Sequence, residues 1–110
     1  MSAQNKTVTP TYAVIFPNRR TALDDEGYAQ TAERMVELVC QQPGCLGFDS
    51  ARDEHGFGIT VSYWDSLKSI EAWRDNPEHM AAQVGGREKW YEHYDLHITK
   101  IEHSHKFRKT

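Results

Sequence analysis

The chain has 110 residues, of which 26% are charged, and it carries a formal net charge of −3 at pH 7. This length suits one domain, and a domain of this size buries about two-thirds of the surface that its unfolded chain exposes. The sequence lacks a basic stripe for nucleic acid, the apolar run of roughly 20 residues that crosses a membrane, and the apolar core of a signal peptide. We therefore expect a cytoplasmic protein that binds neither nucleic acid nor a membrane.

The first part of the chain predicts a tail, a strand and a helix. Residues 1–10 are polar and end in a proline, so we expect a flexible N-terminal tail. The apolar, partly β-branched run at 12–16 predicts a buried strand. Acidic residues at 24–26 can cap the helix that follows, and Pro43 and Gly44 end it. The apolar residues of this helix recur at helical spacing on one face: Tyr28, Ala32, Met35, Val36 and Val39.

A hairpin and a second helical segment follow. Residues 45–52 and 57–64 are joined by a short polar turn, so the two strands should pair antiparallel. Ser66 can cap a helix, and Asn76 followed by a proline restarts it. An i, i+3 stripe places three apolar residues of the first part on one face: Leu67, Ile70 and Trp73.

The end of the chain predicts further helical turns and a last strand. Gly85 and Gly86 break the second helical segment, and residues 87–94 are typical of one or two more helical turns. Residues 95–105 then form the final strand, and residues 106–110 a short C-terminal tail.

This order of elements predicts one α+β domain over residues 11–105. Strand, helix, strand, strand, helix, strand (βαββαβ) is the ferredoxin-like arrangement, an antiparallel sheet with helices on one face. Along residues 57–64, however, bulky side chains alternate on both faces of the strand. Exposing the second face to water would cost about 25 cal/mol per Å² of apolar surface, so a second copy of the chain is expected to cover it. We predict a homodimer.

Four stretches of the chain resemble the antibiotic biosynthesis monooxygenase (ABM) family of the dimeric α+β barrel superfamily. They are YAVIF at 12–16, QPGCLGFDS at 42–50, VSYWDSLKSIEAWRDNPEHMAA at 61–82 and WYEHY at 90–94. The resemblance covers about residues 11–103 and implies a dimeric α+β barrel. The family includes cofactor-independent monooxygenases that oxidise polycyclic phenols to quinones, and also haem-degrading enzymes, so the fold does not choose the reaction.

Two tryptophans are candidate site residues. The resemblance implies that Trp73 is catalytic and faces a pocket, because the family commonly carries an indole at the matching helical position. The apolar stripe on which Trp73 lies is equally compatible with packing in the core. Trp64, at the end of a strand, is a candidate for substrate binding or a packing residue at the rim of the sheet.

His79 is the second catalytic candidate, and it lies near the start of a helix. A helix N-terminus disfavours the protonated imidazole, so His79 can accept or relay a proton. The alternative is an exposed histidine in the first helical turn. In the haem-degrading branch the iron ligand lies ten residues after the matching tryptophan, a position that is Gln83 here. Because glutamine is a poor iron ligand, we expect no haem cofactor.

The segment around residues 87–94 is rich in aromatic residues and contains one arginine. Arg87, Trp90 and Tyr91 could stack on and hydrogen-bond a flat phenolic ligand, or they could close one end of the barrel. We include these three residues with Trp64 among the substrate-binding candidates.

No other motif indicates chemistry. Cys40 and Cys45 flank a turn and are expected to be reduced thiols, and the C-terminal histidines lack the spacing of a metal site. There is no phosphate loop and no flavin or nicotinamide fingerprint. If the chain is an oxygenase, its substrate must supply the electrons.

These observations predict a cofactor-independent monooxygenase that oxidises a small aromatic or phenolic substrate with O₂. The protein would bind the substrate anion, exclude water and position oxygen. Two alternatives remain: a haem-binding or haem-degrading monooxygenase, and a non-catalytic dimer that binds a small hydrophobic ligand.

Overall fold

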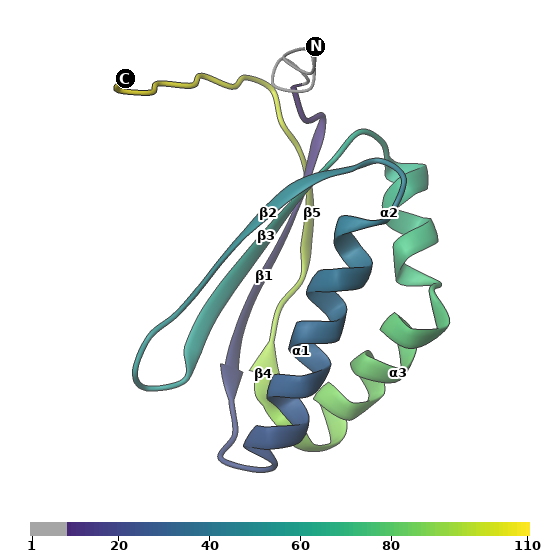
Figure 1. The fold of residues 1–110 in the computed structure, drawn as a ribbon, viewed down its shortest axis with the longest axis vertical. Helices are drawn as coiled ribbons and strands as arrows, with labels where there is room; N and C mark the ends of the chain where they lie inside the picture. Colours follow the sequence, from purple (N-terminus) through teal and green to yellow (C-terminus); the bar gives the residue numbers. More distant parts are fainter. Residues whose placement is uncertain (1–8) are drawn as a thin grey trace.

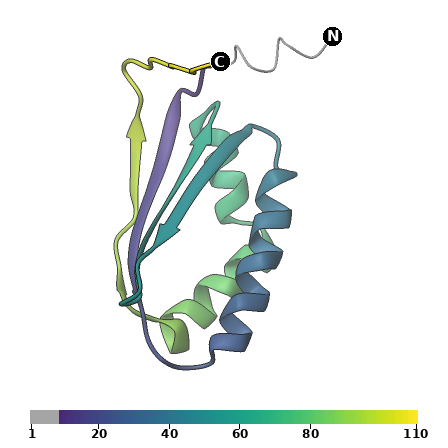
Figure 2. The same ribbon diagram turned by 60° about the vertical axis from the view of Figure 1, so that its left-hand side comes forward.

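The computed structural model describes residues 9–110, which form an α+β fold of two layers (Figure 1). Residues 1–8, most of the predicted tail, lie outside the described residues. One layer is a five-stranded antiparallel sheet, and the helices all lie on one face of it (Figure 2). The elements are β1 (Tyr12–Arg20), α1 (Asp25–Cys40), β2 (Cys45–Arg52), β3 (Phe57–Trp64), α2 (Leu67–Arg74), α3 (Pro77–Gly85), a π-helical turn (Gly86–Trp90), β4 (Tyr91–Tyr94) and β5 (His97–Lys100). The predicted ferredoxin-like fold is confirmed.

The predicted helix caps are present. Asp24 adopts a left-handed backbone conformation (φ 52°), and its carboxylate accepts a hydrogen bond from the Gly27 amide at the start of α1. Ser66 caps α2 in the same manner through the Ser69 amide. Asn76 caps α3 and accepts from two amides of its first turn. These bonds satisfy amides that have no partner within the helix.

β1 is the centre of the sheet. It pairs with β3 over residues 12–19 on one side, and β2 pairs with β3, which gives the order β2-β3-β1-β4. On its other side β1 is shared by two short strands, because β5 pairs with residues 12–15 and β4 with residues 18–20. The gap between them lies opposite Pro17, whose carbonyl accepts a hydrogen bond from the Asp95 amide. Proline has no N–H to donate to this side of the ladder, so the pairing is interrupted there.

The last part of the chain differs from the sequence-based prediction. Helical turns over 87–94 were expected, but helix ends at Trp90 and residues 91–94 form β4. The final strand is also shorter than the predicted 95–105, since β5 comprises only His97–Lys100. Pairing of residues 91–94 with the end of β1 determines the local structure there.

The core lies between the sheet and the first two helices. Val39 of α1, Trp64 of β3 and Ile70 of α2 are buried and in contact. Partly buried apolar side chains pack around them: Tyr12, Val14, Cys45, Phe48 and Trp73. The indole N–H of Trp64 donates to Ser62 Oγ at 2.8 Å, so the buried polar atom has a partner.

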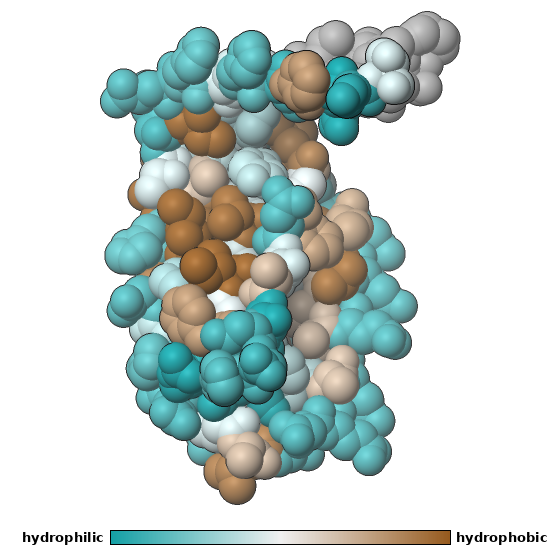
Figure 3. Space-filling view, turned by 90° about the vertical axis from the view of Figure 1, so that its left-hand side faces the viewer, coloured by the Kyte–Doolittle hydropathy of each residue, from teal (hydrophilic) through white to brown (hydrophobic). Residues whose placement is uncertain are grey.

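The other face of the sheet is not covered by a helix and carries an apolar patch (Figure 3). The β1–β3 register places three cross-strand pairs on this face, opposite the side of Trp64: Ala13 with Tyr63, Ile15 with Val61, and Pro17 with Ile59. Within residues 9–110, no helix has the length and hydropathy required to cross a membrane. The cytoplasmic location stays a prediction.

Candidate functional site

The two catalytic candidates lie against each other where α2 gives way to α3. The rings of Trp73 and His79 are stacked, with centroids 4.1 Å apart and an interplanar angle of 11°. The chain turns between them at Asn76, which caps α3 and thereby directs His79 back towards α2. Trp73 also packs against the buried core cluster of Val39, Trp64 and Ile70. Both side chains are only partly buried, so each keeps some exposed surface.

The contact of His79 with a backbone carbonyl indicates the tautomer of its neutral ring. Its Nδ1 lies 2.9 Å from the carbonyl oxygen of Trp73. A carbonyl can only accept, so Nδ1 carries the proton and Nε2 of the neutral ring has a free lone pair. Within residues 9–110 no side chain or backbone group bonds to Nε2. Burial lowers the pKa of His79, and the bond to the Trp73 carbonyl opposes this shift without cancelling it.

Gln83 lies beside this pair. Its side-chain amide nitrogen is 3.3 Å from His79 Nδ1, one helical turn further along α3. The position that carries the iron ligand in the haem-degrading branch therefore holds an amide that contacts the imidazole. Because Nδ1 donates its proton to the Trp73 carbonyl, the Gln83 N–H finds no acceptor there, and the contact is one of packing.

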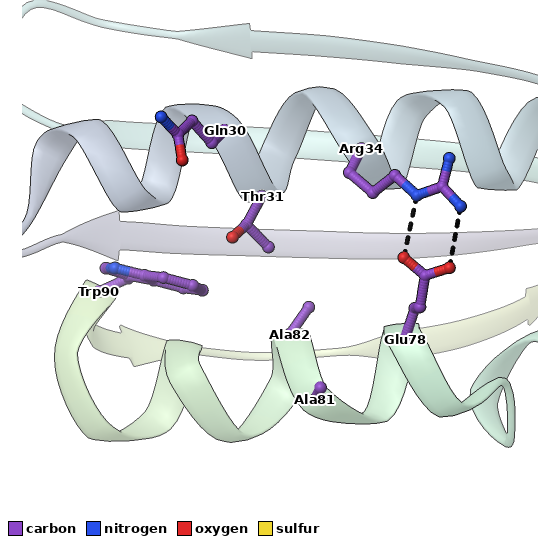
Figure 4. A pocket seen from close by; sticks show the side chains of 7 residues that line it. All are labelled: Gln30, Thr31, Arg34, Glu78, Ala81, Ala82 and Trp90. Carbon is purple, nitrogen blue, oxygen red and sulfur yellow. Dashed lines mark hydrogen bonds and ion pairs between the residues drawn. The ribbon is translucent and has the colours of Figure 1, made fainter.

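A groove of about 280 Å³ separates α1 from α3 (Figure 4). Arg34 of α1 and Glu78 of α3 face each other across it and form a bidentate ion pair, with both N–O distances 2.9 Å. The groove is lined by Gln30, Thr31, Arg34, Glu78, Ala81, Ala82 and Trp90. Trp90 is thus the predicted substrate-binding residue that lines this space.

Trp90 and Tyr91 belong to an aromatic cluster at this end of the molecule. The Trp90 indole is buried, and its N–H donates to Asp24 Oδ2 at 3.2 Å. That bond is the main reason why the pKa of Asp24 is lowered. Tyr91 makes edge contacts with the rings of Phe16 and Tyr28, at 5.5 and 5.9 Å. Burial raises the pKa of Tyr91, and a hydrogen bond with Tyr28 adds to the shift.

The remaining candidates lie elsewhere. Trp64 has 0% of its surface exposed and fills the core, so packing accounts for its position and leaves a ligand nothing to contact. Arg87 is exposed on the π-helical turn. Trp73 and His79 do not line the α1–α3 groove, and they do not line the cavity between the end of β1 and the β2–β3 turn.

A polar row on the helix-facing side of the sheet was missed by the sequence analysis. Arg52 of β2, Gly58 of β3 and Asn18 of β1 are direct neighbours across three strands. Asn18 is 1% exposed, and its Oδ1 accepts a hydrogen bond from Arg52 at 2.7 Å. The same guanidinium donates to the hydroxyl of Tyr28 at 3.0 Å. The available signal was that Asn18 has the same parity in β1 as Val14 and Phe16, which places its amide on the core side of the sheet.

This row adjoins a second cavity of about 550 Å³. Its walls are the end of β1, the β2–β3 turn and the first turns of α1. The lining residues are Arg20, Thr21, Ala22, Asp25, Tyr28, Arg52, Asp53, Glu54, His55, Gly56 and Glu92.

Other reactive groups are isolated in the structure. Cys40 is exposed and Cys45 is half-buried, and burial raises the pKa of Cys45, which disfavours its thiolate. Within residues 9–110, no three histidine, cysteine or acidic side chains are grouped so that they could hold one metal ion.

Comparison with known proteins identifies relatives in sequence and in fold. A family model described as antibiotic biosynthesis monooxygenase matches residues 19–84. The uncharacterized protein YqjZ of Bacillus subtilis (strain 168) is 48% identical over 99 residues, which is 90% of this chain and 86% of YqjZ.

Solved structures share the fold at low sequence identity. SnoaB of Streptomyces nogalater, described as a cofactor-independent oxygenase, superimposes with a TM-score of 0.72 at 8% identity, covering 87% of this chain and 97% of SnoaB. A conserved protein of Methanosarcina mazei Go1 gives 0.74 at 9% identity, covering 84% of this chain and 94% of that one. At these identities the likeness concerns the fold alone.

Proposed function

The chain belongs to the antibiotic biosynthesis monooxygenase family, and on that basis we propose that it is a cofactor-independent monooxygenase of a small phenolic compound. The observation that carries the proposal is the contact of His79 Nδ1 with the Trp73 carbonyl at 2.9 Å, which favours the tautomer whose Nε2 can accept a proton. The family membership and the fold shared with SnoaB support an oxygenase. The substrate itself must then act as the reductant.

The role of His79 in such a reaction is to remove a proton. Nε2 accepts the phenolic proton, and the resulting phenolate is electron-rich enough to react with O₂. For a naphthol, loss of the O–H and one ring C–H hydrogen with insertion of one oxygen atom gives the quinone, and the other oxygen atom leaves as water. The four electrons that reduce O₂ all come from the substrate.

Trp73 is proposed to position the base and the substrate. Stacking at 4.1 Å fixes the plane of the imidazole, and the partly exposed indole offers a flat apolar surface to an aromatic ring. Trp90 in the α1–α3 groove is the further aromatic candidate for contact with the substrate, and Tyr91 and Arg87 remain weaker candidates.

Oxygen uptake by the wild-type protein tests this function. With a naphthol or a hydroxyanthrone, and with EDTA but no flavin or metal present, we expect one O₂ to be consumed for each quinone formed. An oxygen electrode and the quinone absorbance give the two quantities. If no such phenol consumes oxygen, the oxygenase proposal fails and a non-catalytic ligand-binding dimer becomes the better description. If turnover requires haemin and a reductant, the haem-dependent alternative is correct.

We also propose that two copies of the chain associate through the open face of the sheet. Its apolar cross-strand pairs, which include Ile59 at 42% exposure, would otherwise remain in water.

Light scattering at micromolar concentration should give about twice the chain mass of 12.7 kDa. Ile59→Lys is expected to shift the protein towards a monomer, because it places a charge in the proposed interface. Val84→Lys, at a similarly exposed position (45%) on α3, is the matched control and should leave the dimer intact. A monomeric wild-type protein, or equal effects of the two lysines, would contradict this interface.

A further inference from the structure

The second cavity contains two arginines that approach the same tyrosine ring. The guanidinium carbon of Arg20 lies 3.8 Å from the centre of the Tyr28 ring, and that of Arg52 lies 5.7 Å from it. All three side chains line the same cavity of about 550 Å³. Two positive charges are therefore gathered at one point of a space large enough for a small organic molecule.

Arg52 reaches this point because the residue beside it has no side chain. Its partner across the strand is Gly58, and a Cβ at Gly58 would lie 2.8 Å from the Arg52 guanidinium carbon. The guanidinium can thus lie over Gly58 and donate to Asn18 and Tyr28 beyond it. A third bond goes to the carbonyl of Gly56 at 2.7 Å.

The charge of Arg52 has no counter-ion. Its three hydrogen bonds all go to neutral oxygens, and within the described residues it forms no ion pair with a carboxylate. A guanidinium has five N–H donors, so two remain for a ligand. Arg52 is also exposed, and its free donors can be reached from solvent.

Arg20 is under-satisfied as well. Its side chain is only 7% exposed, and its Nε is a buried nitrogen with no hydrogen-bond partner in the described part of the chain. One carboxylate, that of the exposed Asp25, pairs with it at 2.9 Å. The bonds to the carbonyls of Thr21 and Leu23 are long, at 3.4 and 3.5 Å. Of the carboxylates that line the cavity, Asp25 alone pairs with either guanidinium in the described part of the chain, so Arg52 has no carboxylate in contact with it.

The other acidic residues of the cavity limit what can bind. The Asp53 carboxylate accepts hydrogen bonds from the backbone amides of His55 and Phe57, which fix it within the β2–β3 turn. Glu54 lies 4.0 Å from His55 at the exposed end of the turn, and Glu92 is exposed on β4. These carboxylates surround the arginines at the rim, so they would repel a multiply charged ligand more than a singly charged one.

We propose that this cavity binds the carboxylate of a small organic monoanion, with Arg52 as the principal partner and Arg20 as the second. A carboxylate would accept a hydrogen bond from a free N–H of Arg52 and provide the counter-ion that Arg52 lacks beside Tyr28. The inference goes beyond the proposed function, since binding of the acid requires no oxygen chemistry.

Titration of the wild-type protein with 2-naphthoate, followed by NMR of the arginine side-chain Nε–H signals, tests the site directly. The signals of Arg20 and Arg52 should shift on binding, and 2-naphthylmethanol, which has the same ring without the charge, should not produce these shifts. Inorganic phosphate should bind more weakly than the naphthoate. Absence of naphthoate binding, shifts confined to other arginines, or tighter binding of phosphate would overturn the proposal.

Three variants complete the test. Arg52→Gln should weaken naphthoate binding by about 10-fold or more, since it removes a charge-assisted hydrogen bond. Gly58→Ala should do the same without changing the charge, because its methyl group would displace the guanidinium. Arg74→Gln is the control, since Arg74 is exposed and pairs with its neighbour Asp75, away from the cavity. Equal affinities for all three would place the anion elsewhere. Because the titration is measured without O₂ uptake, this result is independent of the proposed oxygenase activity.

Discussion

Replacing His79 with alanine is expected to slow oxidation of a phenol by about 10²–10⁴-fold, the range that a positioned general base contributes. The reason is the free Nε2 of a ring whose other nitrogen is held by the Trp73 carbonyl. Initial rates of O₂ consumption at saturating phenol, with circular dichroism to check the fold, give the measurement. His55→Ala is the matched control, because His55 is an exposed histidine in the β2–β3 turn.

The same assignment fixes the direction of the pH dependence. The pKa of His79 is lowered below its ordinary value of about 6.5, so the neutral base persists at neutral pH and is lost only on acidification through the lowered pKa. The rate should therefore be flat above about pH 6.5 and fall below it. Trp73→Phe should keep the fold but weaken substrate binding. A His79→Ala protein with unchanged rate and unchanged pH profile would show that the stacked pair only packs.

Replacing Trp64 with alanine is expected to destabilise the fold by about 3–5 kcal/mol. The side chain is 0% exposed and joins β3 to α1 and α2 through Val39 and Ile70. Its loss also leaves Ser62 Oγ without the indole N–H. Since small domains are stable by only about 5–15 kcal/mol, much of the protein should unfold at moderate denaturant concentration.

Urea unfolding followed by far-UV circular dichroism measures this change. Leu67→Ala is a suitable control, because Leu67 is an exposed apolar residue on α2 and should cost far less. If Trp64→Ala were no more destabilising than the control, the core would have to be centred elsewhere. That result would favour a ligand-binding role for Trp64.

The features that depend on local sequence were predictable. Asp24, Ser66 and Asn76 cap their helices because a short polar side chain bonds amides two or three residues away, and this rule needs no knowledge of the fold. The stacking of Trp73 on His79 was only partly foreseen. Spacing placed Trp73 on an apolar stripe, but the turn of the chain at Asn76 decides that His79 lies against it.

The features that depend on register were not predictable. Arg52 meets Asn18 across 34 residues of sequence, and the contact exists only because Gly58 stands between them in β3. No periodicity in one strand reveals which residue of another strand faces it. The strand at residues 91–94 was missed for the same reason, because its partner is the end of β1.

The interruption of the sheet opposite Pro17 has a consequence for how the protein avoids aggregation. A long flat outer strand offers a continuous row of unpaired N–H and C=O groups on which foreign chains can add. Here that side of the sheet consists of two strands of four residues each, β4 and β5, separated where Pro17 provides no donor. A strand that docked there would meet an interruption halfway along the row of unpaired N–H and C=O groups. Proline in the central strand thus hinders edge-to-edge growth along one border of the sheet and leaves the broad apolar face as the favoured place for association.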